Sequence, residues 1–348
     1  MLSSVIRNVR ALAAALVLCG LVHMPAEGAA VQRLFISGHS LTDRPMPDML
    51  AAMLAADGRP VAWNRQHIPG STIRERTEGR AGTPPGSGHA AGTDKDGAPI
   101  DIRIELARQP PYDMLIATER YKVLEVMAYE GFPGTLKALD GLFRAANPAG
   151  ASYFYTPWIS LDSRTDPARW IAFERAADPV WRCAVAGVNA KLAQDGAAGR
   201  IGVIPAALAL ADLVGALVAA PEAAGFPQGA KPQDIIAALF TDDVHLTDLG
   251  NYYVALVTYG VAFDGDVLRA PLPAGIDPIR GEAMRRYAAE AVATARATPV
   301  PADCKGMPQR FIADYGAYEA RAYGSGVPGL SWLKRRKADA ALRKALGE

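Results

Sequence analysis

Cysteine is scarce in this sequence, which has 3 cysteines among 348 residues, and its 5 histidines are scattered along the chain. Cys19 lies in an apolar N-terminal stretch, which leaves Cys183 and Cys304 in the remainder. Two thiols and scattered histidines lack the ligand spacing of a structural zinc site, so no such site is predicted. In an exported protein the two thiols can form a disulfide or stay as buried thiols, and their separation in sequence does not decide between these.

An excess of charge of either sign is also missing, because 37 Lys and Arg residues balance 36 Asp and Glu residues to a formal net charge of +1. Proteins that bind nucleic acids use a basic surface to neutralise phosphates. The balance therefore argues against nucleic acid as the main partner, and it is compatible with a small neutral substrate. A basic stretch at 334–337 falls in a helix predicted from residue 331 to the end. We interpret it as a solvated helix face, the alternative being contact with an anionic membrane surface.

Long apolar runs are absent beyond residue 30, where nothing approaches the roughly 18 residues that indicate a membrane-spanning helix. At the N-terminus, two arginines precede an apolar stretch at 11–22, which is shorter than the roughly 20 residues of a span. Small residues ending at Ala30 then fit a cleavage site. We therefore predict that residues 1–30 are a signal peptide and that the mature chain is soluble and periplasmic or extracellular. An uncleaved N-terminal anchor is the alternative.

Alternating strand and helix patterns predict the fold class. Five apolar, β-branched or aromatic runs predict buried strands, at 31–37, 60–66, 113–118, 151–157 and 200–205. Helical patterns lie between or after them, at 46–56, 135–146, 167–194, 206–219, 232–240 and 247–262. The helix at 167–194 contains Pro179, where it can break. The alternation predicts an α/β domain over residues 31–270, with a five-stranded parallel sheet between two layers of helices.

Two segments stand outside this alternation. Residues 71–99 are rich in Gly, Pro, Thr and charge, and they are predicted to form a long surface excursion. No strand-like run follows residue 271, and helices are predicted at 280–297 and 309–323. Residues 271–348 are therefore predicted to be a helical C-terminal extension that packs on the same domain.

A serine directly follows the first predicted strand, in the sequence Gly-His-Ser-Leu-Thr-Asp at 38–43. Ligands of parallel α/β sheets bind beyond the carboxyl ends of the strands, so a residue in this place is a candidate for a site. Ser40 would be exposed at a strand-to-helix turn, with its own amide directed toward developing negative charge. The alternative is that Ser40 only caps the following helix.

A histidine with a nearby carboxylate occurs late in the chain, in the sequence Thr-Asp-Asp-Val-His-Leu-Thr-Asp-Leu-Gly at 241–250. A serine hydroxyl needs a base to accept its proton, and a histidine base needs a carboxylate to fix its tautomer. Asp242 lies three residues before His245, a spacing that lets the carboxylate reach the imidazole in a turn. Asp243 is the less favoured partner, and an acidic surface turn is the alternative for the whole segment.

Together these segments resemble the first and last conserved blocks of the SGNH/GDSL hydrolase superfamily, and the resemblance covers residues 31–265. It implies a flavodoxin-like three-layer α/β/α sandwich and cleavage of esters, with Ser40 as nucleophile, His245 as base and Asp242 as orienting acid. The segment Asn-Arg-Gln-His-Ile-Pro-Gly-Ser-Thr at 64–72 resembles the second block. By that resemblance Gly70 donates its backbone N–H to the oxyanion hole, and an ordinary turn glycine is the alternative.

The sequence departs from the family at two places. His39 stands where the family has Asp before the serine, a change that we expect to be tolerated. After the third strand the family has Gly-x-Asn, whose Asn completes the oxyanion hole, whereas this chain reads Ala-Thr-Glu-Arg-Tyr at 117–121. Thr118 and Arg120 are the candidate substitutes. Glu119 cannot donate as a carboxylate and would repel an oxyanion unless it is protonated or paired, with Arg120 as the candidate partner.

We therefore expect an exported serine esterase or deacylase that acts through an acyl-serine on a small-molecule or carbohydrate ester, without a metal or an organic cofactor. Trp63, Tyr121 and Trp158 are candidates for shaping its cleft. Two alternatives remain open. One is an envelope polysaccharide O-acyltransferase that uses the same residues, and the other is a non-catalytic binding protein on a hydrolase fold.

Overall fold

The computed structural model describes residues 32–78, 86–197, 199–300, 304, 307–321 and 340. The predicted signal peptide lies outside these residues, and so does nearly all of the basic helix predicted from residue 331. No helix in the described part of the chain combines the length and the apolar character needed to span a bilayer.

The centre of the fold is one five-stranded sheet in which every neighbouring pair of strands is parallel. Its strands are β1 (Gln32–Gly38), β2 (Val61–His67), β3 (Met114–Thr118), β4 (Ala151–Tyr155) and β5 (Ile201–Ile204). Their order, β2-β1-β3-β4-β5, is the flavodoxin-like one. The five predicted strands are thereby confirmed. The strand order reverses between β1 and β3, and this is the place where such sheets bind ligands.

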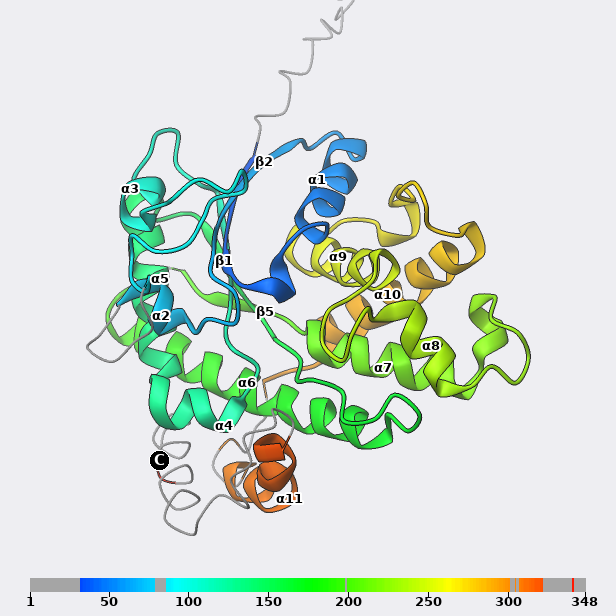
Figure 1. The fold of residues 1–348 in the computed structure, drawn as a ribbon. Helices are drawn as coiled ribbons and strands as arrows, with labels where there is room; N and C mark the ends of the chain where they lie inside the picture. Colours follow the sequence, from blue (N-terminus) through cyan, green and yellow to red (C-terminus); the bar gives the residue numbers. More distant parts are fainter. Residues whose placement is uncertain are drawn as a thin grey trace, which may run out of the picture.

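Helices cover both faces of the sheet and complete a three-layer α/β/α sandwich (Figure 1). One layer contains α1 (Met46–Ala56), α7 (Ala206–Ala219) and α9 (Asp248–Phe263), with α10 (Pro278–Ala297) packed on α9; the other contains α5 (Phe132–Ala146) and α6 (Ala168–Gln194). The shorter elements are α2 (Ile73–Thr77), α3 (Ile102–Leu106), α4 (Val123–Glu125), α8 (Pro232–Leu239), the 3₁₀ turns η1 (Ser40–Thr42), η3 (Pro221–Ala224) and η4 (Val267–Arg269), and the π-turn η2 (Val126–Glu130).

Burial on both faces explains why the strands read as continuous apolar runs. In β1, Leu34, Phe35 and Ile36 are all at most 1% exposed, although consecutive side chains point to opposite faces. Helix α6 continues through Pro179 without the break that the sequence allowed. Trp181, two residues further on, packs its ring 5.2 Å from that of Phe132 of α5, and this contact holds the helix against its neighbour.

The segment predicted as a surface excursion at 71–99 departs from that prediction in its first part. The first part of the segment turns inward, as the full burial of Ile73 and Arg76 shows. A capping box at its N-terminus stabilises α2. Thr72 accepts from Glu75 N at 3.1 Å, and Thr72 N donates to the Glu75 carboxylate at 2.8 Å. This Thr-x-x-Glu signal was readable in the sequence. Among the described residues that follow, Thr93 pairs with His67 at the end of β2.

Within its described residues, the C-terminal region contains the two helices α10 and α11 (Met307–Arg321), and both pack on the sandwich. Helix α11 lies against α6, where Phe173 contacts the rings of Phe311, Tyr315 and Tyr318 at centroid distances of 5.1–5.8 Å. The thiols of α6 and of the segment before α11 form the disulfide Cys183–Cys304. The alternative of two buried free thiols is thereby excluded.

Two glutamates are buried where α11 meets α4 and α6. Glu319 accepts hydrogen bonds from Leu124 N at 3.0 Å and Glu125 N at 3.2 Å, and Glu174 accepts from Ile159 N at 2.6 Å. Burial raises the pKa of Glu319 to about 8, although its hydrogen bonds act in the opposite direction. Burial also raises the pKa of Glu174 well above its usual value.

These raised pKa values predict how stability depends on pH. Because both carboxyls bind protons more tightly in the folded chain, unfolding releases protons between about pH 4.5 and pH 8, and the free energy of unfolding falls as pH rises through this window. Glu319→Gln keeps an acceptor for Leu124 N and removes one titration. The difference in Tm between about pH 5 and about pH 8 should shrink by several degrees, since about 1 kcal/mol shifts the Tm of a large domain by roughly 2–4 °C.

Scanning calorimetry at both pH values measures this difference. Glu222→Gln, at an exposed position of turn η3, is the matched control and should follow the wild type. The interpretation is wrong if the Tm of Glu319→Gln depends on pH as steeply as that of the wild type.

Candidate active site

Three side chains from the two ends of the domain form a continuous line of hydrogen bonds. The hydroxyl of Ser40 lies 3.0 Å from Nε2 of His245, and Nδ1 of His245 lies 2.7 Å from the carboxylate of Asp242. If Nδ1 carries the proton, it donates to Asp242 and leaves Nε2 free to accept from Ser40. The sequence predicted this set of residues, and the structure brings all of them together.

The loop at 241–247, hereafter the Asp242–His245 loop, is held in shape by hydrogen bonds between the Asp242 side chain and the loop's own backbone amides. One carboxylate oxygen of Asp242 accepts from Val244 N at 2.8 Å and from His245 N at 2.7 Å. Burial alone would raise the pKa of Asp242, but the hydrogen bonds from His245 and Val244 lower it to about 2. Asp242 is therefore charged at neutral pH. Asp243 takes no part through its side chain and instead accepts from Leu161 N at its backbone carbonyl, at 2.8 Å.

Ser40 stands in the sharp turn after β1. A side chain at Gly38 would lie 2.0 Å from the hydroxyl of Thr42, so the turn requires glycine there. The turn η1 is capped by His39 rather than by Ser40, and α1 begins only at Met46, which excludes the helix-cap interpretation of Ser40. Asp43 ends the turn with a carboxylate paired to Arg65 and His67 of β2.

His39 is a structural residue under the turn. It is 1% exposed, its Nδ1 accepts from Leu41 N at 3.4 Å, and its Nε2 lies 2.9 Å from the carbonyl of Glu119. Burial, together with the charge of Arg76, lowers the pKa of His39 to about 3. The imidazole is therefore neutral and donates from Nε2, so it links the turn after β1 to the turn after β3.

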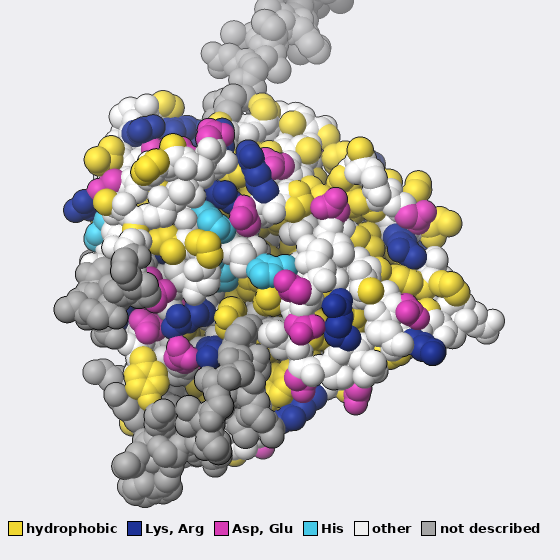
Figure 2. All heavy atoms as spheres, viewed as in Figure 1, with side chains coloured by type: hydrophobic (Ala, Val, Ile, Leu, Met, Phe, Trp, Pro, Cys, Tyr) yellow, Lys and Arg dark blue, Asp and Glu magenta, His cyan; other side chains and the backbone are white. Residues whose placement is uncertain are grey.

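The Ser40 hydroxyl opens into a shallow pocket of about 170 Å³. The residues that line it are Ser40, Leu41, Asp43, Arg44, Trp158, His245, Leu246 and Asn251. The side chains of His245 and Asp242 are 46% and 57% exposed, so the line of hydrogen bonds is open to solvent. Figure 2 shows histidine side chains beside acidic ones near the middle of this face. Of the aromatic residues proposed to shape the cleft, Trp158 lines this pocket and Trp63 lies under the guanidinium of Arg44.

Gly70 lies in the turn after β2, which is attached to the turn that carries Ser40. Ile68 N donates to the carbonyl of Gly38 at 3.2 Å, and Gly70 has a φ of +61°, a conformation that favours glycine. Within the described residues, the amides of Ser40 and Gly70 donate to no protein acceptor. Both amides are therefore available as donors at this edge of the sheet, and of the two residues Ser40 lines the pocket whereas Gly70 does not.

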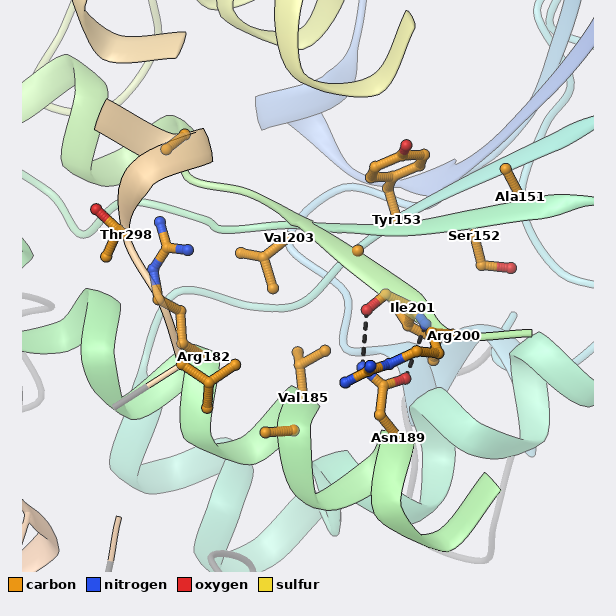
Figure 3. Close-up of a pocket in the computed structure, with 14 residues that line it drawn as sticks. Ala151, Ser152, Tyr153, Arg182, Val185, Asn189, Arg200, Ile201, Val203 and Thr298 are labelled. Carbon is orange, nitrogen blue, oxygen red and sulfur yellow. Dashed lines mark hydrogen bonds between the residues drawn. The ribbon is translucent and has the colours of Figure 1, made fainter. Parts of the chain in front are cut away.

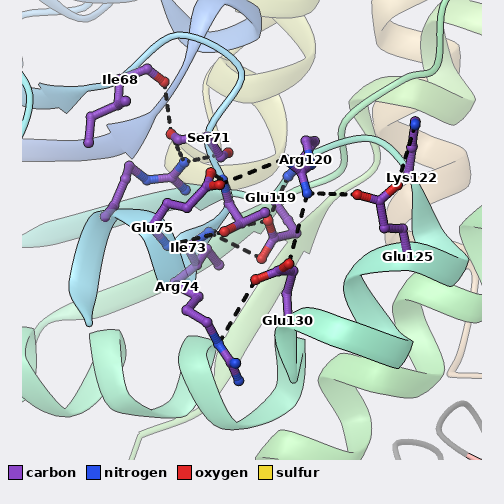
Figure 4. Close-up of polar contacts among 12 residues, drawn as sticks. Ile68, Ser71, Ile73, Arg74, Glu75, Glu119, Arg120, Lys122, Glu125 and Glu130 are labelled. Carbon is purple, nitrogen blue, oxygen red and sulfur yellow. Dashed lines mark hydrogen bonds and ion pairs between the residues drawn. The ribbon is translucent and has the colours of Figure 1, made fainter. Parts of the chain in front are cut away.

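The two proposed substitutes for the family's third-block Asn do not line the pocket at Ser40. Thr118 is fully buried, and its hydroxyl lies 3.5 Å from the carbonyl of Glu119. Arg120 pairs with Glu125 at 2.8 Å and lies within 4 Å of two further glutamates (Figure 4). The Thr118 hydroxyl is buried against a backbone carbonyl, and the Arg120 guanidinium is held among glutamates. Neither side chain is placed as an oxyanion donor.

Glu119 occupies the end of β3 as a buried acceptor. Its carboxylate accepts from Ile73 N at 3.2 Å and from Arg120 N at 2.7 Å (Figure 4). The expected pairing with the guanidinium of Arg120 is not seen, because that group faces other glutamates. Burial raises the pKa of Glu119 to about 7, against the charge of Arg76 and the hydrogen bonds from the two amides. Glu119 thus holds α2 against β3.

Arg76, which sequence reasoning missed, is the buried cation of this region. Its guanidinium donates to Ser37 Oγ at 3.0 Å, to Ser71 O at 2.9 Å and Oγ at 2.8 Å, and to Thr118 O. Burial lowers its pKa to about 10, whereas the nearby Glu119 acts to raise it. Nothing in the local sequence marks this arginine, because its burial depends on β1, β3 and the turn before α2.

A larger pocket of about 420 Å³ lies at the β5 edge, between β5, α6 and the end of α10 (Figure 3). Asn189 there exchanges two hydrogen bonds with the backbone of Ile201, at 2.7 and 2.9 Å, so its amide completes the edge of β5. Arg182 is paired with Asp178 at 2.6 Å. This pocket holds no histidine among its lining residues, and the Ser40 pocket remains the candidate active site.

Neither the protein-family models nor the curated proteins include a match to this sequence. Among solved structures, the fold is similar to the crystal structure of a DUF4886 family protein from Bacteroides uniformis, with a TM-score of 0.50 and 16% sequence identity. The similarity covers 76% of this chain and 95% of that one. At this identity it shows a shared fold.

Removal of the Arg76 guanidinium should be strongly destabilising. Arg76→Met leaves buried acceptors on three segments unpaired and Glu119 without its cation, so the free energy of unfolding should fall by about 3–5 kcal/mol. The matched control is Arg175→Met, whose guanidinium is 55% exposed and pairs with Asp212. It should cost less than about 1 kcal/mol. Urea denaturation followed by circular dichroism compares the two, and equal losses would contradict the role given to Arg76.

Proposed function

We propose that this protein is a serine ester hydrolase that acts through an acyl-serine on Ser40. The observation that carries the proposal is the line of hydrogen bonds from Ser40 through His245 to Asp242, at 3.0 and 2.7 Å. Its position supports the proposal too, because it lies beyond the carboxyl end of β1, where the strand order reverses. The resemblance of the two segments to SGNH/GDSL hydrolases points to the same chemistry.

In the proposed acylation step, Ser40 Oγ attacks the carbonyl carbon of the ester while His245 Nε2 accepts the hydroxyl proton. The carboxylate of Asp242, which is charged above about pH 2, stabilises the imidazolium that forms. The amides of Ser40 and Gly70 donate to the oxyanion of the tetrahedral intermediate. The intermediate then collapses, and the alcohol leaves with the proton from Nε2. Water repeats the sequence with the acyl-enzyme, and the acid and Ser40 are released.

The size and openness of the pocket support a short acyl group on a larger, exposed alcohol. Its volume of about 170 Å³ is below the roughly 300–1,000 Å³ of sites that enclose a drug-sized ligand. An open site places little restriction on the alcohol part, so an acylated carbohydrate would fit. The predicted export signal is consistent with such a substrate outside the cytoplasm.

An O-acyltransferase is the second candidate. The exposure of His245, at 46%, would allow a sugar hydroxyl as well as water to reach the acyl-serine. The residues and the first half of the reaction are the same for both functions. Product analysis with and without an oligosaccharide acceptor distinguishes them, because only a transferase forms the acylated acceptor.

The assignment of Ser40 and Asp242 predicts a specific pattern of losses. With p-nitrophenyl acetate, Ser40→Ala should fall to background, and Asp242→Asn should lose kcat by on the order of 10⁴, because the wrong tautomer of His245 would face Ser40. Asp243→Asn is the matched control and should keep near wild-type activity, since its backbone carbonyl alone is used. Equal losses at positions 242 and 243 would refute the assignment.

Labelling with a fluorophosphonate, followed by mass spectrometry, tests the nucleophile without a substrate. The label should be found on Ser40 of the wild type and should be missing from Ser40→Ala. A wild-type protein that neither turns over esters nor labels at Ser40 would favour the non-catalytic binding protein instead.

Pocket size predicts the preferred acyl length. The kcat/KM for p-nitrophenyl acetate should exceed that for the octanoate by on the order of tenfold or more, because a long chain finds no enclosed apolar surface. Leu246→Ala removes part of the wall and should narrow this ratio. A wild-type preference for octanoate would show that the acyl group binds elsewhere.

A further inference from the structure

We propose that residues 157–164, hereafter the supporting segment, position the Asp242–His245 loop for reaction with Ser40, with Trp158 as the main positioning residue. Two hydrogen bonds join the two segments, and a third holds the residue just before the loop. Trp158 Nε1 donates to Val244 O at 2.8 Å, Leu161 N donates to Asp243 O at 2.8 Å, and Arg164 donates to Phe240 O at 3.0 Å. This inference rests on the proposed function of Ser40.

The Asp242–His245 loop needs an external support. Its internal hydrogen bonds fix Asp242 relative to His245, and Thr247 anchors its far end through Leu239 O at 2.9 Å. None of these contacts reaches Ser40, which lies on a different element 205 residues away. Three consecutive loop residues lie between Thr241 and His245, and the supporting segment holds the backbone carbonyls of two of them. The distance from His245 to Ser40 therefore depends on where that segment lies.

The supporting segment is itself held by buried contacts. Trp158 and Ile159 are at most 1% exposed. From α6, Glu174 accepts from Ile159 N at 2.6 Å and Trp170 Nε1 donates to Ile159 O at 2.7 Å. A carboxylate and an indole of one helix thus fix both backbone groups of a single residue next to Trp158.

Helix α11 adds a contact from the C-terminal region. Tyr318 donates to the carboxylate of Asp162 at 3.2 Å, and the disulfide Cys183–Cys304 joins the segment before α11 to α6. A continuous path of contacts therefore runs from the C-terminal helix through the supporting segment to the Asp242–His245 loop. This path gives the C-terminal extension a part in shaping the site, although no residue of α11 lines the Ser40 pocket.

Two variants remove one hydrogen bond each, and they differ in their contact with substrate. Trp158→Phe keeps an aromatic ring at the pocket and removes the indole N–H. Arg164→Met removes the bond to Phe240 O, next to the loop, at a residue that does not line the pocket, and Arg164→Lys keeps a cationic donor. The matched control is Trp181→Phe. Trp181 is fully buried between Phe132 and Phe154, and its N–H has no partner within the described part of the chain.

Two readouts separate positioning from stability. The first is the rate of fluorophosphonate labelling of Ser40, with kcat and KM for p-nitrophenyl acetate measured alongside. The second is the low-field proton NMR resonance of His245 Nδ1–H, which reports the hydrogen bond to Asp242 and needs no turnover. Melting temperatures of all variants show whether each one folds.

Trp158→Phe and Arg164→Met should lower the labelling rate and kcat by roughly 10- to 100-fold, because a displacement of about 1 Å at a reacting group can cost that much. Arg164→Met should leave KM unchanged, and Arg164→Lys should recover most of the rate. The Nδ1–H resonance should shift or broaden in Trp158→Phe and Arg164→Met. In Trp181→Phe the rates and the resonance should match those of the wild type, even if its Tm falls.

Equal rates and an equal resonance in Trp158→Phe, Arg164→Met and Trp181→Phe would overturn the positioning role. A different result identifies a failure of the proposed function. If Ser40 of the wild type does not label, hydrolysis through Ser40 is wrong, and the resonance of His245 in the same variants still decides whether the supporting segment positions the loop.

Discussion

The buried guanidinium of Arg76 is the interaction on which the carboxyl edge of the sheet depends. A charge taken out of water costs several kcal/mol unless it is paired and hydrogen-bonded. Ser37, Ser71 and Thr118 supply the acceptors, and Glu119 supplies nearby negative charge. Because these residues belong to β1, to the turn before α2 and to β3, one side chain fixes three segments at once. A displacement of any of them would leave a buried donor without its acceptor, so the three segments behave as one unit.

The candidate site combines two halves that are held in different ways. The half that carries the free amides of Ser40 and Gly70 is built on the unit around Arg76, and His39 joins it to the turn after β3. The other half is the Asp242–His245 loop, an exposed segment held from outside by hydrogen bonds to two of its backbone carbonyls and to that of the preceding Phe240. Such a division suits the proposed chemistry. Oxyanion donors act best when they are fixed in advance, whereas the imidazole must remain open to substrate and water.

Local patterns were sufficient to predict the five strands, most of the long helices and the set of Ser40, Asp242 and His245. Strand periodicity and the residues directly after strands are properties of short stretches, and the sheet then brings the strand ends together. The burial of Arg76, by contrast, depends on segments from three parts of the chain, and a lone arginine in a polar stretch reads as exposed. The roles proposed for Thr118 and Arg120 failed for the same reason, since their partners lie on other elements. Sequence separation could not decide the disulfide, which depends on how α11 packs.

Glu119, the residue after β3, cannot donate to an oxyanion as a carboxylate, but it supports the site by accepting backbone hydrogen bonds. Glu119 accepts from Ile73 N and Arg120 N, and these bonds fix α2 and the adjacent turn of Gly70 against β3. Loss of one side-chain donor from an oxyanion hole costs on the order of 10²–10³ in rate. A backbone donor that is already held in place needs no reorganisation as charge develops, so it can recover part of that loss. Under the proposed function, the chain has no side-chain donor from the turn after β3 and relies on the backbone amides of Ser40 and Gly70.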